Sequence, residues 1–130
     1  MIVVDASAVA EVLLRMAAAE AVERRLHDMR ETLHAPHFLD LEVAHVIRRY
    51  AARGAIDAER GREAIEDLAD FPVGRHPHVP LLPRIWELRN NLTAYDAAYV
   101  ALAEALDAPL VTCDRRLAGA PGHRARIEVI

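Results

Sequence analysis

The sequence predicts an α/β fold with a central, mostly parallel sheet, because short apolar strands alternate with amphipathic helices along the whole chain. The segments 2–4 and 110–113 are short, apolar and rich in β-branched residues, as buried strands of a parallel sheet are. Segments with apolar residues at helical spacing separate them, and parallel strands require such right-handed crossover connections. The length of 130 residues, with 53% apolar and 28% charged residues, is that of one globular domain, so we expect residues 1–130 to form a single unit.

The first part of the chain contains three of the expected strands. The expected elements are, in order, a strand at 2–4, a helix with apolar positions from Val9 to Met16, a helix from about Ala19 to Met29, a strand at 32–35, a helix from 40 to 53, a helix from 57 to about 71 and an edge strand at 73–76. Pro36 closes the second strand, and Asp40 is the expected N-cap of the third helix. Gly54 is placed to end that helix as its C′ residue.

The last third of the chain has the clearest pattern. The expected elements are a helix carrying Ile85, Trp86 and Leu88 after Pro80 and Pro83, a helix at 93–106, a strand at 110–113, a short helix from 114 to 117 and a final strand at 127–130. The segment 93–106 is apolar almost all round, which predicts a helix buried in the centre of the domain. Asp107, Ala108 and Pro109 end it.

Composition excludes several classes of protein. The net charge is −4, and all 16 basic residues are arginine, so chemistry that needs a lysine is excluded. Receiver domains and aspartyl-phosphatases use such a lysine, and a P-loop needs a Gly-Lys pair. The turn after the first strand is Asp5-Ala6-Ser7 and lacks the glycines of a dinucleotide fold. The single Cys113 excludes an internal disulfide. The chain shows no apolar run of membrane-spanning length and no signal-peptide pattern, and these features predict a cytoplasmic location.

Four acidic residues occupy equivalent places in the predicted fold. Asp5 and Asp114 each follow a strand and begin a helix, whereas Glu42 and Asp96 lie in the first turn of their helices. Each taken alone is explained as a helix cap or as a favourable charge at a helix N-terminus. Because strand ends and helix starts meet at the carboxyl edge of a parallel sheet, the four carboxylates are expected to converge in one crevice.

Such a cluster predicts a cation. Crowded carboxylates repel one another, and a divalent ion removes the conflict. A set of oxygen ligands without clustered cysteine or histidine selects Mg²⁺ or Mn²⁺. Mg²⁺ keeps several water ligands, so the site leaves room for a phosphate group and an attacking water, as in metal-assisted phosphodiester hydrolysis.

Three segments resemble PIN-domain ribonucleases, specifically the VapC-like toxins of toxin–antitoxin pairs. They are VVDASAVAEVLL, APHFLDLEVAHVIRR and LTAYDAAYVALAEALDAPLVTCDRRLA, in the order of the family and over almost the whole chain. The resemblance implies an α/β/α sandwich, Mg²⁺- or Mn²⁺-dependent endoribonuclease activity, a homodimer and an antitoxin protein that blocks the site.

The resemblance also implies residue roles. Asp5, Asp96 and Asp114 would bind metal, and Glu42 would bind metal or orient the water. The hydroxyl groups of Ser7 and Thr112 would support the acids. His45 departs from the family, which often has a small polar residue such as asparagine after the second acid.

The remaining candidates concern the RNA. Arg89, Arg115 and Arg116 are candidates for phosphate contacts because they lie near the third and fourth acids in sequence. Tyr95 is the aromatic residue best placed to face a base, while Tyr99 and Trp86 are expected to pack. His76-Pro77-His78 matches no common zinc spacing and is interpreted as a loop. The alternative function is a PIN-like scaffold that binds RNA or a protein without cutting.

Overall fold

The computed structural model describes residues 1–27 and 30–130, and its centre is a five-stranded sheet in the order β3-β2-β1-β4-β5. All neighbouring strands run parallel. The strands are β1 (Ile2–Val4), β2 (Leu33–Pro36), β3 (Val73–His76), β4 (Leu110–Thr112) and β5 (Ile127–Val129). The predicted α/β class and parallel sheet are therefore confirmed.

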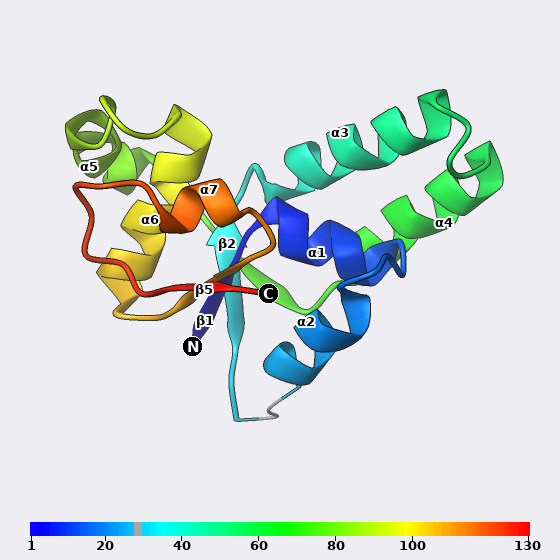
Figure 1. Ribbon diagram of the computed structural model, residues 1–130, viewed down its shortest axis with the longest axis horizontal. Coiled ribbons are helices and arrows are strands. Elements are labelled where there is room, and N and C mark those ends of the chain that lie inside the picture. Colours follow the sequence, from blue (N-terminus) through cyan, green and yellow to red (C-terminus); the bar gives the residue numbers. More distant parts are fainter. Residues whose placement is uncertain (28–29) are drawn as a thin grey trace.

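Helices cover both faces of the sheet. They are α1 (Ala6–Leu13), α2 (Ala19–Leu26), α3 (Leu39–Ala52), α4 (Ala58–Ala69), the short 3₁₀ helix η1 (Val79–Leu81), α5 (Leu82–Glu87), α6 (Ala94–Leu106) and α7 (Arg115–Ala118). Figure 1 shows α1 to α4 on one side of the sheet and α5 and α6 on the other, with α3 and α4 extending outwards as a pair. This arrangement is the expected α/β/α sandwich.

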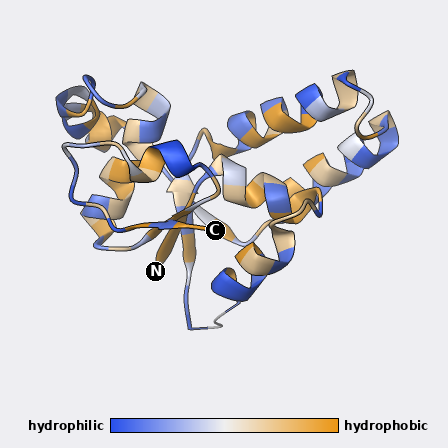
Figure 2. Cartoon of the chain, in the orientation of Figure 1, coloured by the Kyte–Doolittle hydropathy of each residue, from blue (hydrophilic) through white to orange (hydrophobic). Residues whose placement is uncertain are grey.

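The core forms around β1 and α6. Ile2, Val3 and Val4 are fully buried because β1 is the central strand with helices over both faces. α6 contributes Tyr99 and Val100 to the same core. Figure 2 shows apolar residues along these elements and polar residues on the outer faces of α2 and α4. Among the described residues, no helix is both long and apolar enough to cross a membrane.

Most of the predicted helix ends are confirmed. Asp57 caps α4 by accepting a hydrogen bond from the Arg60 backbone N–H, and Thr93 caps α6 in the same way. Gly54 follows α3 with a φ of +73°, a conformation that favours glycine. The second strand lies one residue later than predicted, at 33–36.

Several expectations differ from the structure. α1 ends at Leu13 rather than continuing to Met16, because the chain turns at Arg15, which has a φ of +51°. α4 ends at Ala69, two residues before the expected end. The predicted apolar position Met29 lies outside the described residues. Trp86 was expected to pack but is 67% exposed on α5.

The assignment of Asp40 as a helix cap is wrong. α3 begins at Leu39 without a side-chain cap, and Asp40 lies in its first turn. There it accepts two hydrogen bonds of 2.8 Å from Arg75 of β3, which also donates to the carbonyl oxygens of Val73 and Leu68. Two parallel hydrogen bonds between a guanidinium and a carboxylate are stronger than the single hydrogen bond of a helix cap. In this structure they connect the edge strand β3 to α3, and the bond from Arg75 to Leu68 connects β3 to α4.

This ion pair yields a stability prediction. Asp40→Ala should lower the free energy of unfolding by about 1–2 kcal/mol, because the half-buried Arg75 loses both charged hydrogen bonds. The measurement is urea denaturation followed by circular dichroism. Asp67→Ala, which changes an exposed aspartate on α4, is the control and should change the value by less than about 0.5 kcal/mol. Equal small effects for the two variants would contradict a stabilising role of the pair.

Candidate active site

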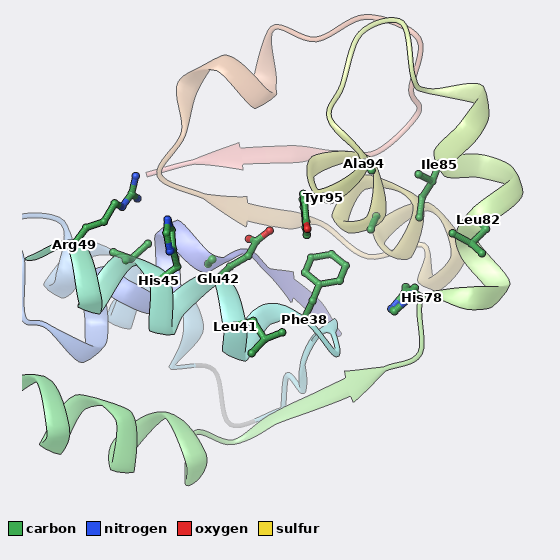
Figure 3. A pocket seen from close by; sticks show the side chains of 13 residues that line it. Phe38, Leu41, Glu42, His45, Arg49, His78, Leu82, Ile85, Ala94 and Tyr95 are labelled. Atoms are coloured by element: carbon green, nitrogen blue, oxygen red, sulfur yellow. The ribbon is translucent and has the colours of Figure 1, made fainter.

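The predicted acidic residues lie at the carboxyl edge of the sheet. Asp5 directly follows β1, and Asp114 lies two residues after Thr112, the last residue of the neighbouring β4. Glu42 and Asp96 lie in the first turns of α3 and α6, which start near the same edge. Figure 3 shows the Glu42 side chain extending from α3 towards the start of α6.

Asp5 is the most buried of these acids, with 7% of its surface exposed. Its Oδ1 accepts hydrogen bonds from the Ser7 hydroxyl at 2.6 Å and from the Ala8 N–H at 3.0 Å. Its Oδ2 accepts one from the Thr112 hydroxyl at 2.5 Å. Burial raises the pKa of Asp5, these hydrogen bonds oppose the rise, and the negative charge of Asp96 adds to it. Asp5 is thus both the N-cap of α1 and a carboxylate of the site.

Ser7 and Thr112 connect the two strand ends through their hydroxyl groups. Each hydroxyl has a single proton, and both protons are donated to Asp5, so the oxygen atoms act as acceptors for the backbone. The Cys113 N–H donates to Ser7 Oγ and the Asp114 N–H donates to Thr112 Oγ1, each at 2.9 Å. These bonds fix the turn after β4 relative to Asp5.

Glu42 is held by a residue whose role the sequence did not reveal. The hydroxyl of Tyr99, a fully buried residue of α6, donates to Glu42 Oε2 at 3.2 Å. Burial is the main cause that raises the pKa of Glu42 to about 7; the Tyr99 bond lowers it, and the charges of Asp96 and Asp5 raise it. The signal in the sequence was the spacing, because Tyr99 lies three residues after Asp96 on the same helix.

Asp96 interacts electrostatically with two of the other acids, because its charge raises the pKa of both Asp5 and Glu42. Asp114 differs because it has its own counter-ion. Arg116 donates to the two carboxylate oxygens of Asp114 at 2.8 and 3.1 Å, and this contact lowers the pKa of Asp114. The structure therefore brings Asp5, Glu42 and Asp96 together and holds Asp114 at the same edge in an ion pair.

The predicted arginines have unequal surroundings. Arg116 is occupied by Asp114, although its side chain is 91% exposed. The Arg89 guanidinium stacks over the Trp86 ring at 4.5 Å and donates to the Trp86 carbonyl oxygen. Arg115 is exposed at the start of α7.

A cavity of about 740 Å³ adjoins Glu42 between α3 and the segment from η1 to α6 (Figure 3). Its walls are mainly apolar, and Tyr95 lies at its edge with 58% of its surface exposed. Polar side chains that line it are Glu42, His45, Arg49 and His78. His45, the residue at which this chain departs from the family pattern, thus lines this cavity, one helical turn after Glu42 on α3.

The acids and the two hydroxyl groups beside Asp5 offer oxygen atoms as possible ligands. As the side chains stand, no three acidic, histidine or cysteine residues in the described part of the chain are grouped closely enough to hold a metal ion. The donor chemistry nevertheless suits a hard divalent cation, because the charge of Asp96 raises the pKa of both Asp5 and Glu42, and a nearby cation would lower those pKa values.

Comparison with known proteins gives consistent matches. The family model of the PIN domain matches residues 2–122. Ribonuclease VapC12 of Mycobacterium tuberculosis is 45% identical over 130 residues, which cover 100% of this chain and 99% of that protein. The crystal structure of M. tuberculosis VapC20, a sarcin–ricin loop cleaving toxin, has a TM-score of 0.69 with 14% identity, covering 92% of this chain and 94% of that one.

A second solved structure extends the likeness in fold. VapBC2 from Rickettsia felis, bound to a DNA fragment from its promoter, has a TM-score of 0.70 with 13% identity. The match covers 99% of this chain and 98% of that chain.

The raised pKa of Glu42 predicts an unusual pH dependence for the metal-free protein. The unfolded chain loses the Glu42 proton near its ordinary pKa of 4.5, whereas the folded chain keeps it up to about pH 7. The folded state therefore binds more protons in this range, and the free energy of unfolding falls as the pH rises through it. In EDTA at about pH 8, Glu42→Gln should be more stable than the unchanged protein by about 1–2 kcal/mol.

The measurement is thermal unfolding at about pH 5 and about pH 8 in EDTA. The gain in stability from Glu42→Gln should be small at the lower pH, because Glu42 is then largely protonated in the folded protein and position 42 is uncharged in both the unchanged protein and the variant. Glu23→Gln, at an exposed position of α2, is the control and should give no pH-dependent gain. A gain of the same size at both pH values would show that the carboxylate of Glu42 is not destabilised.

Proposed function

The chain belongs to the PIN domain family, and we propose that it is a Mg²⁺- or Mn²⁺-dependent endoribonuclease, the toxin of a toxin–antitoxin pair. The observation that supports this proposal is that the charge of Asp96 acts on both Asp5 and Glu42, although the three residues come from separate segments that begin at one edge of the sheet. The full-length similarity to a protein named as a VapC ribonuclease supports the same reaction class.

Asp5, Asp96 and Asp114 would hold the metal, with Glu42 either binding it or orienting the water. When bound, a divalent ion would supply positive charge for the phosphodiester and favour deprotonation of a water molecule. Ser7 and Thr112 keep the two oxygens of Asp5 in place. Arg116 balances the charge of Asp114 in the metal-free protein, and a bound ion would balance it in place of Arg116.

Glu42 is the candidate proton acceptor of this reaction. In the metal-free protein the pKa of Glu42 is raised to about 7, and a bound cation would lower it, so the carboxylate would be ionised and able to take a proton from water at neutral pH. Tyr99 holds Oε2, so the proton would pass to Oε1. Tyr99 is thus a positioning residue that keeps Glu42 beside Asp5 and Asp96.

The substrate is proposed to be RNA with a folded structure. The name of VapC20 describes cleavage of the sarcin–ricin loop, and a related surface shape would suit another structured RNA. Arg115 and Arg89 are the candidates for phosphate contacts, because Arg116 is engaged with Asp114. Tyr95, exposed beside Glu42, is placed to meet an unstacked base.

Two protein partners complete the proposal. An antitoxin is proposed because the resemblance to VapC-like toxins implies one, and this chain shares its fold with VapBC2 of Rickettsia felis. A homodimer is proposed because large apolar side chains are exposed on α3 and on the contacting elements η1, α5 and α6. These residues, which we name the apolar surface, are Leu41, Val79, Leu82, Trp86 and Tyr95.

The decisive experiment separates the capping role of Asp5 from its role in the site. Asp5→Asn should leave the helix cap and the fold intact, because asparagine caps as well as aspartate. RNA cleavage should fall at least about 100-fold, because the variant loses the charge that holds the cation. The assay is cleavage of structured RNA in Mg²⁺, in Mn²⁺ and in EDTA.

Asp57→Asn is the matched control, because Asp57 caps α4 through an equivalent hydrogen bond but lies outside the site. It should retain activity within about twofold. Cleavage that persists in EDTA or in Asp5→Asn would refute the metal-dependent nuclease. A chain that binds RNA but cuts none of a broad panel would favour the alternative, a non-catalytic scaffold.

The apolar surface predicts the state of association. Trp86→Glu should weaken the dimer at least tenfold, because it would place a charge where the proposed interface excludes water. Light scattering over a range of concentrations measures this. Ile65→Glu changes an apolar residue that is 41% exposed on α4, away from that surface, and should leave the dimer intact. An unchanged protein that remains monomeric at high micromolar concentration would contradict the proposal.

A further inference from the structure

Two histidines on the neighbouring strands β2 and β3 are in contact. His34 is on β2, and His76 is the last residue of the edge strand β3. The distance from His34 Nδ1 to His76 Nε2 is 2.8 Å, and the ring centres are 5.0 Å apart. The function proposed above uses neither residue.

The strand register explains why the rings meet. His34 pairs with Gly74, so His76 is its diagonal neighbour on the same face of the sheet. A side chain at position 74 would crowd this contact, since a Cβ built on Gly74 lies 3.2 Å from His34 Nδ1. Glycine thus leaves the ring nitrogen of His34 open to His76.

The pair also has an outer partner and an adjoining space. Thr32 Oγ1 lies 2.8 Å from His34 Nε2 and can accept its proton, which leaves the Nδ1 lone pair available. Histidine ligands of metals commonly have such an outer hydrogen bond. A cavity of about 540 Å³, lined in part by His34, Thr32 and Gly74, provides room for water beside His34.

We propose that His34 Nδ1 and His76 Nε2 bind a divalent transition-metal ion, with water molecules in the remaining positions. An N–N distance of 2.8 Å and metal–nitrogen bonds of about 2.1 Å give an angle of about 85° at the metal. This is near the right angle between neighbouring ligands of Ni²⁺ or Cu²⁺ and below the tetrahedral angle. The rings need only turn towards a common point, with the His76 proton on Nδ1.

The charges near the pair are compatible with a cation. Burial, the neighbouring His76 and the N-terminal amino group lower the pKa of His34, so its ring is neutral at neutral pH, as a ligand must be. The amino group of Met1 forms an ion pair with Glu31, which reduces its repulsion of the ion. Glu31 and His27 also line the adjoining cavity.

The ligand chemistry distinguishes this pair from the acidic residues. Imidazole nitrogen favours Ni²⁺, Cu²⁺ and Zn²⁺, whereas carboxylate oxygen favours Mg²⁺ and Mn²⁺. An ion at the pair would join the edge strand β3 to β2. It should therefore stabilise the folded state by mass action without taking part in RNA cleavage.

The test is calorimetric titration of the untagged protein with Ni²⁺ in excess Mg²⁺, together with thermal unfolding. We expect one Ni²⁺ per chain and a melting temperature that rises with Ni²⁺. His34→Gln and His76→Gln should each weaken binding at least tenfold. His78→Gln is the matched control, because His78 is an exposed histidine two residues from the pair, and it should bind as the unchanged protein does.

Circular dichroism and RNA cleavage in Mg²⁺ check that the pair variants are folded, and both should be unchanged. Equal Ni²⁺ affinity in the unchanged protein and in the pair variants would overturn the proposal. So would loss of binding in His78→Gln of the same size, or no binding to the unchanged protein. If His34→Gln fails to fold, His76→Gln decides alone, because β3 is an edge strand.

Discussion

The structure depends on a carboxylate buried at the end of its central strand. Asp5 follows three fully buried residues, and burying its charge without compensation would cost several kcal/mol. Three hydrogen bonds supply the compensation, two from hydroxyl groups and one from the backbone of α1. The start of α1, the end of β4 and the position of the acid are therefore determined together, because each supplies a partner that the others need.

Glu42 is likewise positioned by a hydrogen bond from another element of the fold. Its hydrogen bond comes from Tyr99 of α6, so the position of an acid on α3 depends on the packing of a different helix. Tyr99 also packs edge-on against Phe38, with the ring centres 5.5 Å apart, just before α3 begins. The apolar core and the acidic site thus share a residue: the Tyr99 ring stabilises the packing and its hydroxyl group orients the carboxylate.

The sequence predicted the fold well because hydrophobic periodicity and helix caps are local signals. The strand ends that carry Asp5 and Asp114 followed from the alternation of strands and helices, and parallel strands place such ends at one edge. The role of Asp40 was predicted wrongly because its partner, Arg75, lies 35 residues away, and a local pattern contains no information about that contact. For the same reason the sequence did not reveal the bond between Tyr99 and Glu42, 57 residues apart, or the pairing of His34 with His76.

Asp114 and Asp5 show how one local motif serves two electrostatic environments. Both residues follow a strand and cap a helix, so the sequence pattern treats them alike. Asp5 is enclosed by neutral hydrogen-bond donors, and burial raises its pKa; Asp114 is partly exposed and neutralised by Arg116, which lowers its pKa. A neutral donor fixes the geometry of a carboxylate but leaves its charge in place, whereas an arginine cancels the charge. The site thus combines an acid fixed by neutral hydrogen-bond donors with one whose counter-ion, Arg116, has an exposed side chain. If the proposed cation binds here, Asp5 would offer it a carboxylate fixed by neutral donors, whereas Asp114 would be free to hold it only after its ion pair with Arg116 is broken.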